Sequence, residues 1–261
     1  MVYTAGVALN RFDLYTICVQ DVAGAARFLA AVHGGSPRDL REDFSGAAGI
    51  CGAWVALDPA ARAIAVDRDP EPLRHAPGNP RITIVRGDVL EVGSKADVIA
   101  ALNFPIGYWH TRAELMRYLS LSRRRLRPGG VLVVDLYGGA GAFQPGISTR
   151  RLRGPSGERI LYEWDQEDGD EVTGMVHNAI HFRVTTRGGR TRVFRRAFEY
   201  HWRLWSIPEL RDAMNEAGFT SVEVHDRLGD AVDSDGRLHV RPMGADDRLD
   251  EEWVVYVTGR C

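Results

Sequence analysis

The sequence RDLREDFSGAAGICG, from Arg38 to Gly52, organises the rest of the chain. Leu40 to Phe44 has the composition of a short strand, Ser45 to Gly49 contains only small residues, and Ile50 to Leu57 suits a helix. Small residues let a backbone approach a ligand, and the first turn of a helix presents free N–H groups. The stretch therefore predicts a Rossmann-like nucleoside site, although Phe44 stands where a first glycine is usual. An ordinary strand-to-helix turn is the alternative.

Acidic residues follow the next two predicted strands. Asp67 ends the apolar run 63–66 and lies 21 residues after Gly46, a distance at which a carboxylate can accept hydrogen bonds from ribose hydroxyls. The third strand, 81–85, leads into Gly87-Asp88-Val89. There Asp88 can accept a hydrogen bond from the adenine amine, and Val89 can offer its N–H. A surface aspartate that merely ends a strand is the alternative for Asp67.

Strands and helices alternate through the first part of the chain. Asp21 caps a helix that ends at His33, and capping boxes at Thr111 and Ser206 begin two others. Further strands are expected at 96–102, 131–136, 222–224 and 253–257, with a loop at 229–252 before the last. This alternation predicts an α/β fold with a Rossmann-like, seven-stranded, mostly parallel sheet and helices on both faces. We assign residues 1–150 and 206–261 to this core.

Residues 158–205 follow a period of two instead, which predicts an inserted antiparallel β lid, residues 151–205, that covers the substrate. A three-residue loop would pair Arg187 with Thr191, align Val184 with Phe194 and Ile180 with Phe198, and place His177 opposite His201. One face is then apolar, with the residues Val172, Val176, Ile180, Phe182, Val184, Phe194, Phe198, Tyr200, Trp202 and Leu204. The other face is polar, and an ordinary solvated hairpin face is the alternative to a substrate-binding one.

Composition limits the classes of function. The chain has 261 residues, of which 44% are hydrophobic and 26% charged, and a net charge of −2, so it has no general attraction for nucleic acid or anionic membranes. Its cysteines, Cys18, Cys51 and Cys261, are too few for a disulfide framework and lack metal-site spacing. We expect a cytoplasmic protein without a metal site. The absence of a signal peptide and of an apolar run of about 18 residues predicts no membrane segment.

Taken together, the motifs resemble class I S-adenosylmethionine-dependent methyltransferases. They are EDFSGAAG, the acid Asp67, GDV at 87–89, NFPIGYW at 103–109, LRPGGVLVVDLY at 126–137, and Gly218-Phe219 with the strands that follow. The resemblance covers nearly the whole chain and implies S-adenosylmethionine as cofactor, with Glu42 orienting its methionine end. The cofactor-binding residues it implies are Arg41, Glu42, Phe44, Ser45, Gly46, Asp67, Arg68, Asp88, Val89, Asn103 and Phe104.

Three residues are catalytic candidates. Tyr108 follows the fourth strand with Asn103 and Phe104, beside the expected methyl group, and Tyr15 can close the pocket from the N-terminal segment. His201, as a neutral imidazole beside His177, can accept a proton from the acceptor. A packed core tyrosine and solvent-facing histidines are the alternatives.

The leading functional hypothesis is methyl transfer to a nitrogen or oxygen of a small-molecule acceptor. The β insertion resembles those of small-molecule N-methyltransferases that act on amino sugars or glycine. A protein or RNA methyltransferase is an alternative, because arginines cluster at 183–196. A catalytically silent cofactor-binding protein and an NAD-dependent oxidoreductase are the others. We expect no membrane or nucleic-acid partner, and a homodimer is possible.

Overall fold

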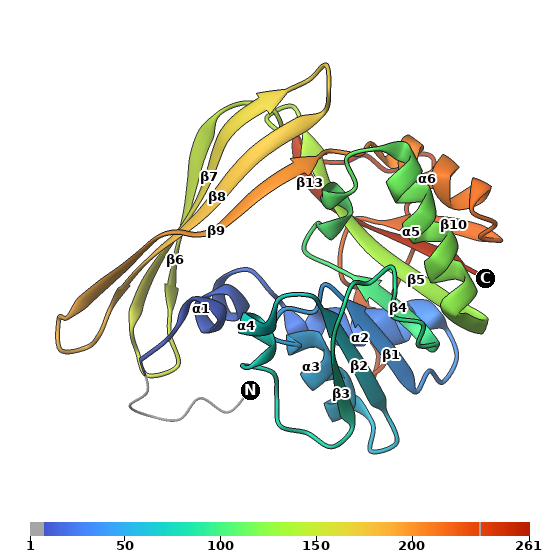
Figure 1. The fold of residues 1–261 in the computed structure, drawn as a ribbon, viewed down its shortest axis with the longest axis horizontal. Helices are drawn as coiled ribbons and strands as arrows, with labels where there is room; N and C mark the ends of the chain where they lie inside the picture. The colour runs from blue at the N-terminus through green and yellow to red at the C-terminus, as the bar shows by residue number, and fades with distance from the viewer. Residues whose placement is uncertain (1–7, 235) are drawn as a thin grey trace.

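A computed structural model describes residues 8–234 and 236–261, so the first seven residues of the predicted core segment lie outside the described residues. Its main element is a seven-stranded sheet in the order β10-β13-β5-β4-β1-β2-β3 (Figure 1). Strands β1 to β5 pair in parallel, and β13 is antiparallel to both of its neighbours. The strands are β1 (Asp39–Asp43), β2 (Arg62–Asp67), β3 (Ile82–Arg86), β4 (Ala96–Ala101), β5 (Leu126–Gly139), β10 (Ser221–His225) and β13 (Glu252–Arg260). The predicted fold class is confirmed.

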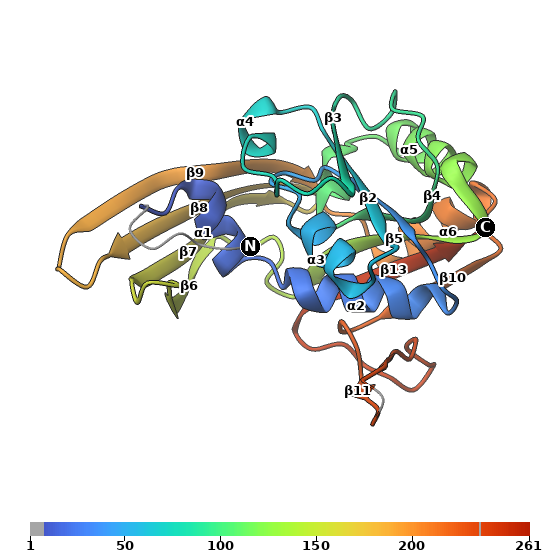
Figure 2. The same cartoon turned by 90° about the horizontal axis from the view of Figure 1, so that it is seen from below.

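Helices cover both faces of this sheet (Figure 2). On one face lie α2 (Val22–His33) and α3 (Gly49–Leu57), and on the other α5 (Arg112–Arg125) and α6 (Ile207–Glu216). The predicted caps are present: the Asp21 side chain caps α2, and Thr111 and Ser206 form capping boxes. Shorter helices are α1 (Arg11–Cys18), α4 (Pro70–Leu73) and the 3-10 helix η1 (Pro105–Tyr108).

Alternate residues of the central strands enter two hydrophobic cores. Val98 and Val131 pack with α2 and α3, whereas Ile99 and Leu132 pack with α5 and α6. All four side chains are fully buried, and each contributes about 1.5–3 kcal/mol to folding. The two covered faces explain why these strands read as continuous apolar runs.

The insertion forms a separate antiparallel sheet, the lid, in the order β6-β7-β8-β9 (Figure 1). Its strands are β6 (Gly146–Arg153), β7 (Arg159–Asp170), β8 (Met175–Thr185) and β9 (Thr191–Arg203), and the first of them begins at Gly146. Helix α1 packs on the lid, where Leu14 and Cys18 share a core with Tyr162 and Val176. Helix α1 is thereby held against the lid, and it reaches the main domain through the ion pair of Arg11 with Glu71.

The predicted register of the β8–β9 hairpin holds only near the pocket. His177 pairs with His201 and Ile180 with Phe198, as predicted. Beyond this point Phe182 pairs with Phe194 and Thr185 with Thr191, so the predicted pairs Arg187–Thr191 and Val184–Phe194 are wrong.

A bulge in β9 causes the shift. Residues 195–197 oppose His181 alone, and Arg196 has a φ of 46° and donates its N–H to His181 Nδ1 at 3.1 Å. Such a bulge bends its strand and redirects its side chains. The assignment of Val172 to the buried face is also wrong, because Val172 lies between β7 and β8 and is 95% exposed.

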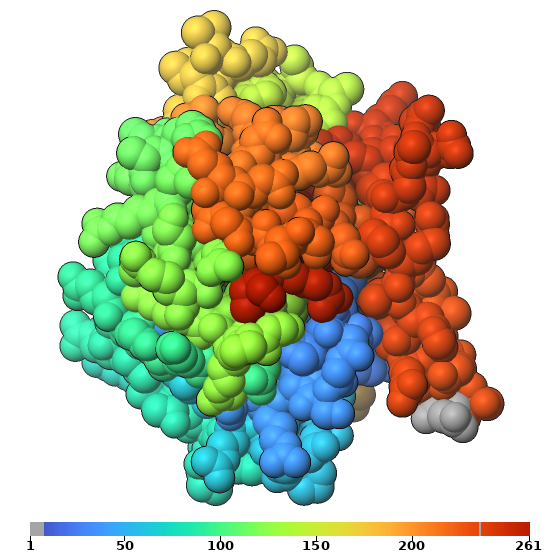
Figure 3. All heavy atoms as spheres, turned by 90° about the vertical axis from the view of Figure 1, so that its right-hand side faces the viewer, coloured from blue at the N-terminus to red at the C-terminus, as the bar shows by residue number. Residues whose placement is uncertain are grey.

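The expected loop at 229–252 contains a short hairpin, β11 (Ala231–Val232) and β12 (Leu238–His239). It stands at the side of the molecule next to α2 (Figure 3), against which Leu238 and Val240 pack. Within residues 8–234 and 236–261, no helix is long and apolar enough to cross a membrane.

Candidate active site

The strand order places a crevice at the carboxyl ends of β1 and β4. The chain runs outward from β1 through β2 to β3 and then returns to β4 on the other side of β1. In open α/β sheets ligands bind where the order reverses in this way. A pocket of about 840 Å³ opens at this point, lined by the β1–α3 turn, the residues after β2, β3 and β4, helix α1 and strand β9.

The β1–α3 turn presents its backbone to this pocket. Phe44, Gly46 and Ala48 have φ angles of 55°, 54° and 54°, so Phe44 itself adopts the left-handed conformation for which a glycine is usual. A Cβ atom on Gly46 would meet no protein atom within 4 Å, so this position faces open space. Ser45 Oγ is buried and has no hydrogen-bond partner among the described residues. A ligand can therefore come close to the backbone of this turn, and the Ser45 hydroxyl is free to form a hydrogen bond with it.

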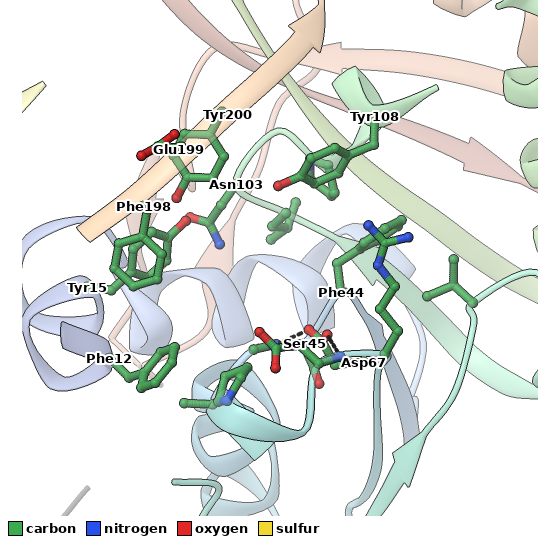
Figure 4. Close-up of a pocket in the computed structure, with 18 of the residues that line it drawn as sticks. Phe12, Tyr15, Phe44, Ser45, Asp67, Asn103, Tyr108, Phe198, Glu199 and Tyr200 are labelled. Atoms are coloured by element: carbon green, nitrogen blue, oxygen red, sulfur yellow. Dashed lines mark hydrogen bonds between the residues drawn. The ribbon is translucent and has the colours of Figure 1, made fainter. Parts of the chain in front are cut away.

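Two carboxylates flank the turn. Asp67 accepts hydrogen bonds from Gly46 N at 2.8 Å and Asp69 N at 2.9 Å (Figure 4). Each carboxylate oxygen has a second lone pair, so Asp67 can still accept bonds from a diol. Asp88 accepts from Leu90 N at 2.8 Å through Oδ1 and lines the pocket together with Val89.

The loop after β4 is held from behind by a buried carboxylate. Asn103 and Phe104 both have positive φ angles, 73° and 66°, and donate their N–H groups to Asp135, each at 2.7 Å. Asp135 is 4% exposed, and burial raises its pKa to about 7, against the lowering effect of these two bonds. Asn103 lines the pocket.

Aromatic side chains form the opposite wall, which we call the aromatic wall: Phe12 and Tyr15 from α1, Tyr108 from η1, and Phe198, Tyr200 and Trp202 from β9. Figure 4 shows Tyr15, Phe198 and Tyr200 facing the space above Ser45 and Asp67. Tyr15 packs against Phe198 at 4.9 Å between ring centroids, and Tyr108 stacks on Phe44 at 6.0 Å.

Burial keeps the tyrosine hydroxyls of this wall neutral. It raises the pKa of Tyr15, Tyr108 and Tyr200 above the ordinary value of a phenol. The hydrogen bond between the hydroxyls of Tyr15 and Tyr200 lowers the pKa of Tyr15 and raises that of Tyr200, and for both residues burial has the larger effect. Neutral phenols donate and accept hydrogen bonds but do not remove protons. Tyr15 and Tyr108 are therefore suited to binding an acceptor and not to acting as general bases.

His201 lies exposed at the mouth of the pocket. Its ring is 6.0 Å from that of His177 and 5.2 Å from that of His110, measured between centroids. His177 lies 3.2 Å from Glu167 and does not line the pocket. The cross-strand histidine pair exists, but His201 alone faces the pocket.

Three predicted cofactor residues lie elsewhere. Arg41 is 0% exposed and bonds to backbone carbonyls and to Asp43 within the core. Glu42 accepts from Cys51 N at 2.9 Å beneath α3, where burial raises its pKa to about 7. Phe104 points behind the loop and packs on Tyr137 and Trp202. None of these three residues lines the pocket, so their predicted role in binding the cofactor would be indirect, through the backbone that they hold.

The other predicted residues come together. Those that line the pocket are Tyr15, Phe44, Ser45, Gly46, Asp67, Arg68, Asp88, Val89, Asn103, Tyr108 and His201. Sequence reasoning missed Phe12, Phe198, Tyr200, Trp202 and, behind the loop, Asp135. The alternation in β9 predicts a buried apolar face for its aromatic residues, and the pattern alone does not show that this face continues into a pocket. Asp135 lies within the apolar run of β5, where an isolated acid is the one signal that the sequence offers.

Comparison with known proteins defines the fold. No protein-family model and no curated protein matches the chain. DesVI from Streptomyces venezuelae is similar in structure, with a TM-score of 0.73 and 18% identity over 97% of this chain and 99% of its own. The sugar N-methyltransferase KedS8 from Streptoalloteichus sp ATCC 53650 has a TM-score of 0.67 and 20% identity over 100% and 96% of the two chains. SAM-bound CalS10, an amino pentose methyltransferase from Micromonospora echinaspora, has a TM-score of 0.68 and 16% identity over 99% and 100%.

The chain has the fold of the S-adenosylmethionine-dependent methyltransferases. The match extends over the lid as well as the main sheet, because nearly the whole of each chain is covered. At identities of 20% or less the likeness concerns the fold, and the activity has to be argued from the pocket.

Proposed function

We propose that this chain is an S-adenosylmethionine-dependent methyltransferase that methylates a nitrogen or oxygen of a small molecule. The observation that carries the proposal is that one pocket joins the glycine turn and its two carboxylates to the aromatic wall. Donor and acceptor can then lie side by side in one pocket. Positioning of this kind supplies much of the acceleration in a methyl transfer.

The residues present fit the donor. Asp88 and Val89 suit an adenine, Asp67 suits the ribose hydroxyls, and the open face of Gly46 leaves room for the chain that carries the sulfonium. The unpartnered Ser45 hydroxyl supplies a further polar contact. A volume of about 840 Å³ suits two small molecules, because such pockets usually measure roughly 300–1,000 Å³.

When bound, S-adenosylmethionine supplies an electrophilic methyl carbon whose bond to sulfur breaks as the acceptor attacks. The protein aligns the acceptor. The neutral hydroxyls of Tyr15 and Tyr200 and the amide of Asn103 can hold an amine or hydroxyl by hydrogen bonds. His201, at the mouth, is placed to receive the proton that an ammonium or hydroxyl acceptor must lose.

An amine on a small polar molecule is the acceptor we propose to test first. Two structural neighbours carry the names sugar N-methyltransferase and amino pentose methyltransferase. The aromatic wall supports this choice, because aromatic faces and neutral phenols bind ammonium groups well. A cytoplasmic location, in keeping with three free cysteines, and a homodimer remain proposals.

A larger anionic acceptor, RNA or protein, is the second candidate. The lid carries the arginines Arg151, Arg153, Arg159 and Arg183 on paired positions of one sheet face. All four are exposed, and none forms an ion pair within the described part of the chain. Such a face attracts polyanions in a salt-dependent way.

Incubation with methyl-labelled S-adenosylmethionine tests the proposal. The panel comprises amino sugars, simple amines, alcohols, total RNA and an acidic protein, and products are read by label transfer and mass spectrometry. Label in a small amine or alcohol supports the proposal. Label confined to RNA or protein would establish the second candidate instead. Binding of S-adenosylmethionine without transfer to any member of a broad metabolite extract would favour a silent binding protein.

A further inference from the structure

Two buried arginines lie beneath the loop that follows β3. Arg41, on β1, donates from Nη2 to the carbonyl of Val89 at 3.0 Å and from Nη1 to that of Val92 at 2.5 Å. Arg125, at the end of α5, donates to the carbonyls of Val89 at 2.6 Å and Leu90 at 2.7 Å. The Val89 carbonyl therefore accepts from both guanidinium groups.

The arginines are themselves fixed in place. Arg41 is 0% and Arg125 7% exposed. Arg41 Nε donates to Asp43 at 2.7 Å, and the other oxygen of Asp43 accepts from the Tyr118 hydroxyl at 3.2 Å. Arg41 thus pairs directly with Asp43, whereas Arg125 feels this carboxylate only through space and has loop carbonyls as its hydrogen-bond acceptors. Buried charges are costly unless they are fully hydrogen-bonded. The two guanidinium groups therefore need the loop carbonyls as acceptors, and this requirement holds the loop in one position.

The contact is transmitted to the pocket through one peptide group. In a trans peptide the C=O and N–H point in opposite directions. The peptide whose carbonyl belongs to Val89 has the N–H of Leu90, which donates to Asp88 Oδ1 at 2.8 Å. The arginines donate hydrogen bonds to the carbonyl of this peptide from inside the core. The N–H of the same peptide donates to the Asp88 carboxylate and holds it at the pocket. The polarisation of the carbonyl also strengthens the bond that its N–H donates.

We propose that Arg41 and Arg125 are positioning residues that select adenine over other purines by fixing Asp88. The inference rests on the proposed function, in which Asp88 accepts a hydrogen bond from the adenine amine. A base with a carbonyl at that position would place oxygen against the carboxylate. Discrimination then depends on how firmly Asp88 is held, and a loose Asp88 can turn away from the wrong base.

The test compares two ligands on three proteins by calorimetry. The ligands are S-adenosylhomocysteine and S-inosylhomocysteine, which carries a carbonyl in place of the adenine amine. The proteins are the wild type, Arg41→Met and the control Arg260→Met. Arg260 also donates to backbone carbonyls, those of Val32 and His33, but does not line the pocket.

We expect the wild type and Arg260→Met to prefer the adenine ligand by about tenfold or more, because a hydrogen-bonding site strongly rejects a mismatched group. In Arg41→Met the preference should shrink several-fold towards equality. An unchanged preference in folded Arg41→Met would overturn the inference. If Arg41→Met does not fold, Arg125→Met replaces it, since Arg125 donates to the same carbonyl. A wild type that binds neither ligand refutes the proposed function itself, which is a distinguishable failure.

Discussion

Asp135→Asn is the most informative single substitution, because Asp135 lies behind the loop that follows β4 without lining the pocket. Its two oxygens accept the N–H groups of Asn103 and Phe104 at 2.7 Å each. Asparagine has nearly the same shape but replaces one acceptor with a donor. One backbone N–H would then face an NH₂ group instead of an oxygen.

Asp135→Asn should lower both the free energy of unfolding and the turnover. A buried N–H without an acceptor costs about 1–3 kcal/mol of unfolding free energy. Asn103 and Phe104 also hold left-handed conformations that cost on the order of 1–3 kcal/mol each and persist only while their surroundings impose them. We therefore expect the loop to relax and Asn103 to leave its place. A shift of about 1 Å in such a loop costs roughly 100-fold in turnover.

The stability cost of Asp135→Asn should also depend on pH, in a direction that the pKa of Asp135 determines. Burial raises the pKa of Asp135 to about 7, whereas in the unfolded chain it is about 3.9. Between these values the folded state binds the proton more tightly, so the wild type loses stability from this group as the pH rises, by up to about 1.4 kcal/mol per unit. Asparagine does not titrate. Urea denaturation should therefore show a larger cost of Asp135→Asn at pH 5 than at pH 8.

Asp97→Asn is the matched control at the other end of the sheet. Asp97 accepts the N–H groups of Arg38 and Asp39, each at 2.9 Å. Burial raises the pKa of Asp97, but these bonds and the Arg127 guanidinium outweigh it, so the pKa lies below its usual value. The stability this group contributes is lost only as the pH falls below about 4. Asp97→Asn should cost stability equally at pH 5 and pH 8 and leave turnover unchanged. Equal turnover of Asp135→Asn and Asp97→Asn would refute the reasoning.

Three further predictions concern the pocket walls. Gly46→Val should abolish S-adenosylhomocysteine binding, because the valine side chain would enter open pocket space; the control Gly34→Val, at a position with a φ of 75° and equal room outside the pocket, should bind normally. Equal affinities of the two variants would show that the turn does not face the cofactor. Tyr15→Phe should raise the KM for the acceptor and leave the pH profile of turnover unchanged up to about pH 9, because burial raises the pKa of Tyr15 beyond that range. Loss of the alkaline limb of the turnover profile in Tyr15→Phe would identify Tyr15 as a titrating group. His201→Gln should lower turnover, while His177→Gln should not, because of these two residues only His201 lines the pocket; unchanged turnover in His201→Gln would exclude it as the base.

Much of the fold could be predicted because its signals are local. The caps at Asp21, Thr111 and Ser206 begin their helices where the sequence indicates. The acids Asp67 and Asp88 lie at strand ends on one edge of the sheet, which parallel pairing brings together. Periodicity of this kind depends on neighbouring residues and not on distant packing.

What could not be predicted depends on tertiary contacts. Arg41 and Glu42 sit on a strand covered on both faces, so their side chains enter the core beneath α5 and α3 instead of reaching the strand edge. Polar residues in a buried strand look the same in sequence as residues at its end. The bulge at Arg196 shifts the hairpin register by two residues and has no sequence signal of its own. Tyr200 alternates like a core residue and becomes a pocket wall only where α1 and η1 leave space beside β9.

The central claim is that the pocket binds S-adenosylmethionine through the glycine turn and Asp67. Calorimetric titration of wild type and Asp67→Ala with S-adenosylhomocysteine, and of wild type with NAD, tests it most directly. Asp67 also accepts the Gly46 N–H at 2.8 Å, so thermal unfolding of both proteins is measured alongside. We predict saturable binding of S-adenosylhomocysteine, no binding of NAD, and an affinity loss of about 1–3 kcal/mol in folded Asp67→Ala. Binding of NAD in place of S-adenosylhomocysteine, or unchanged affinity in Asp67→Ala, would contradict it.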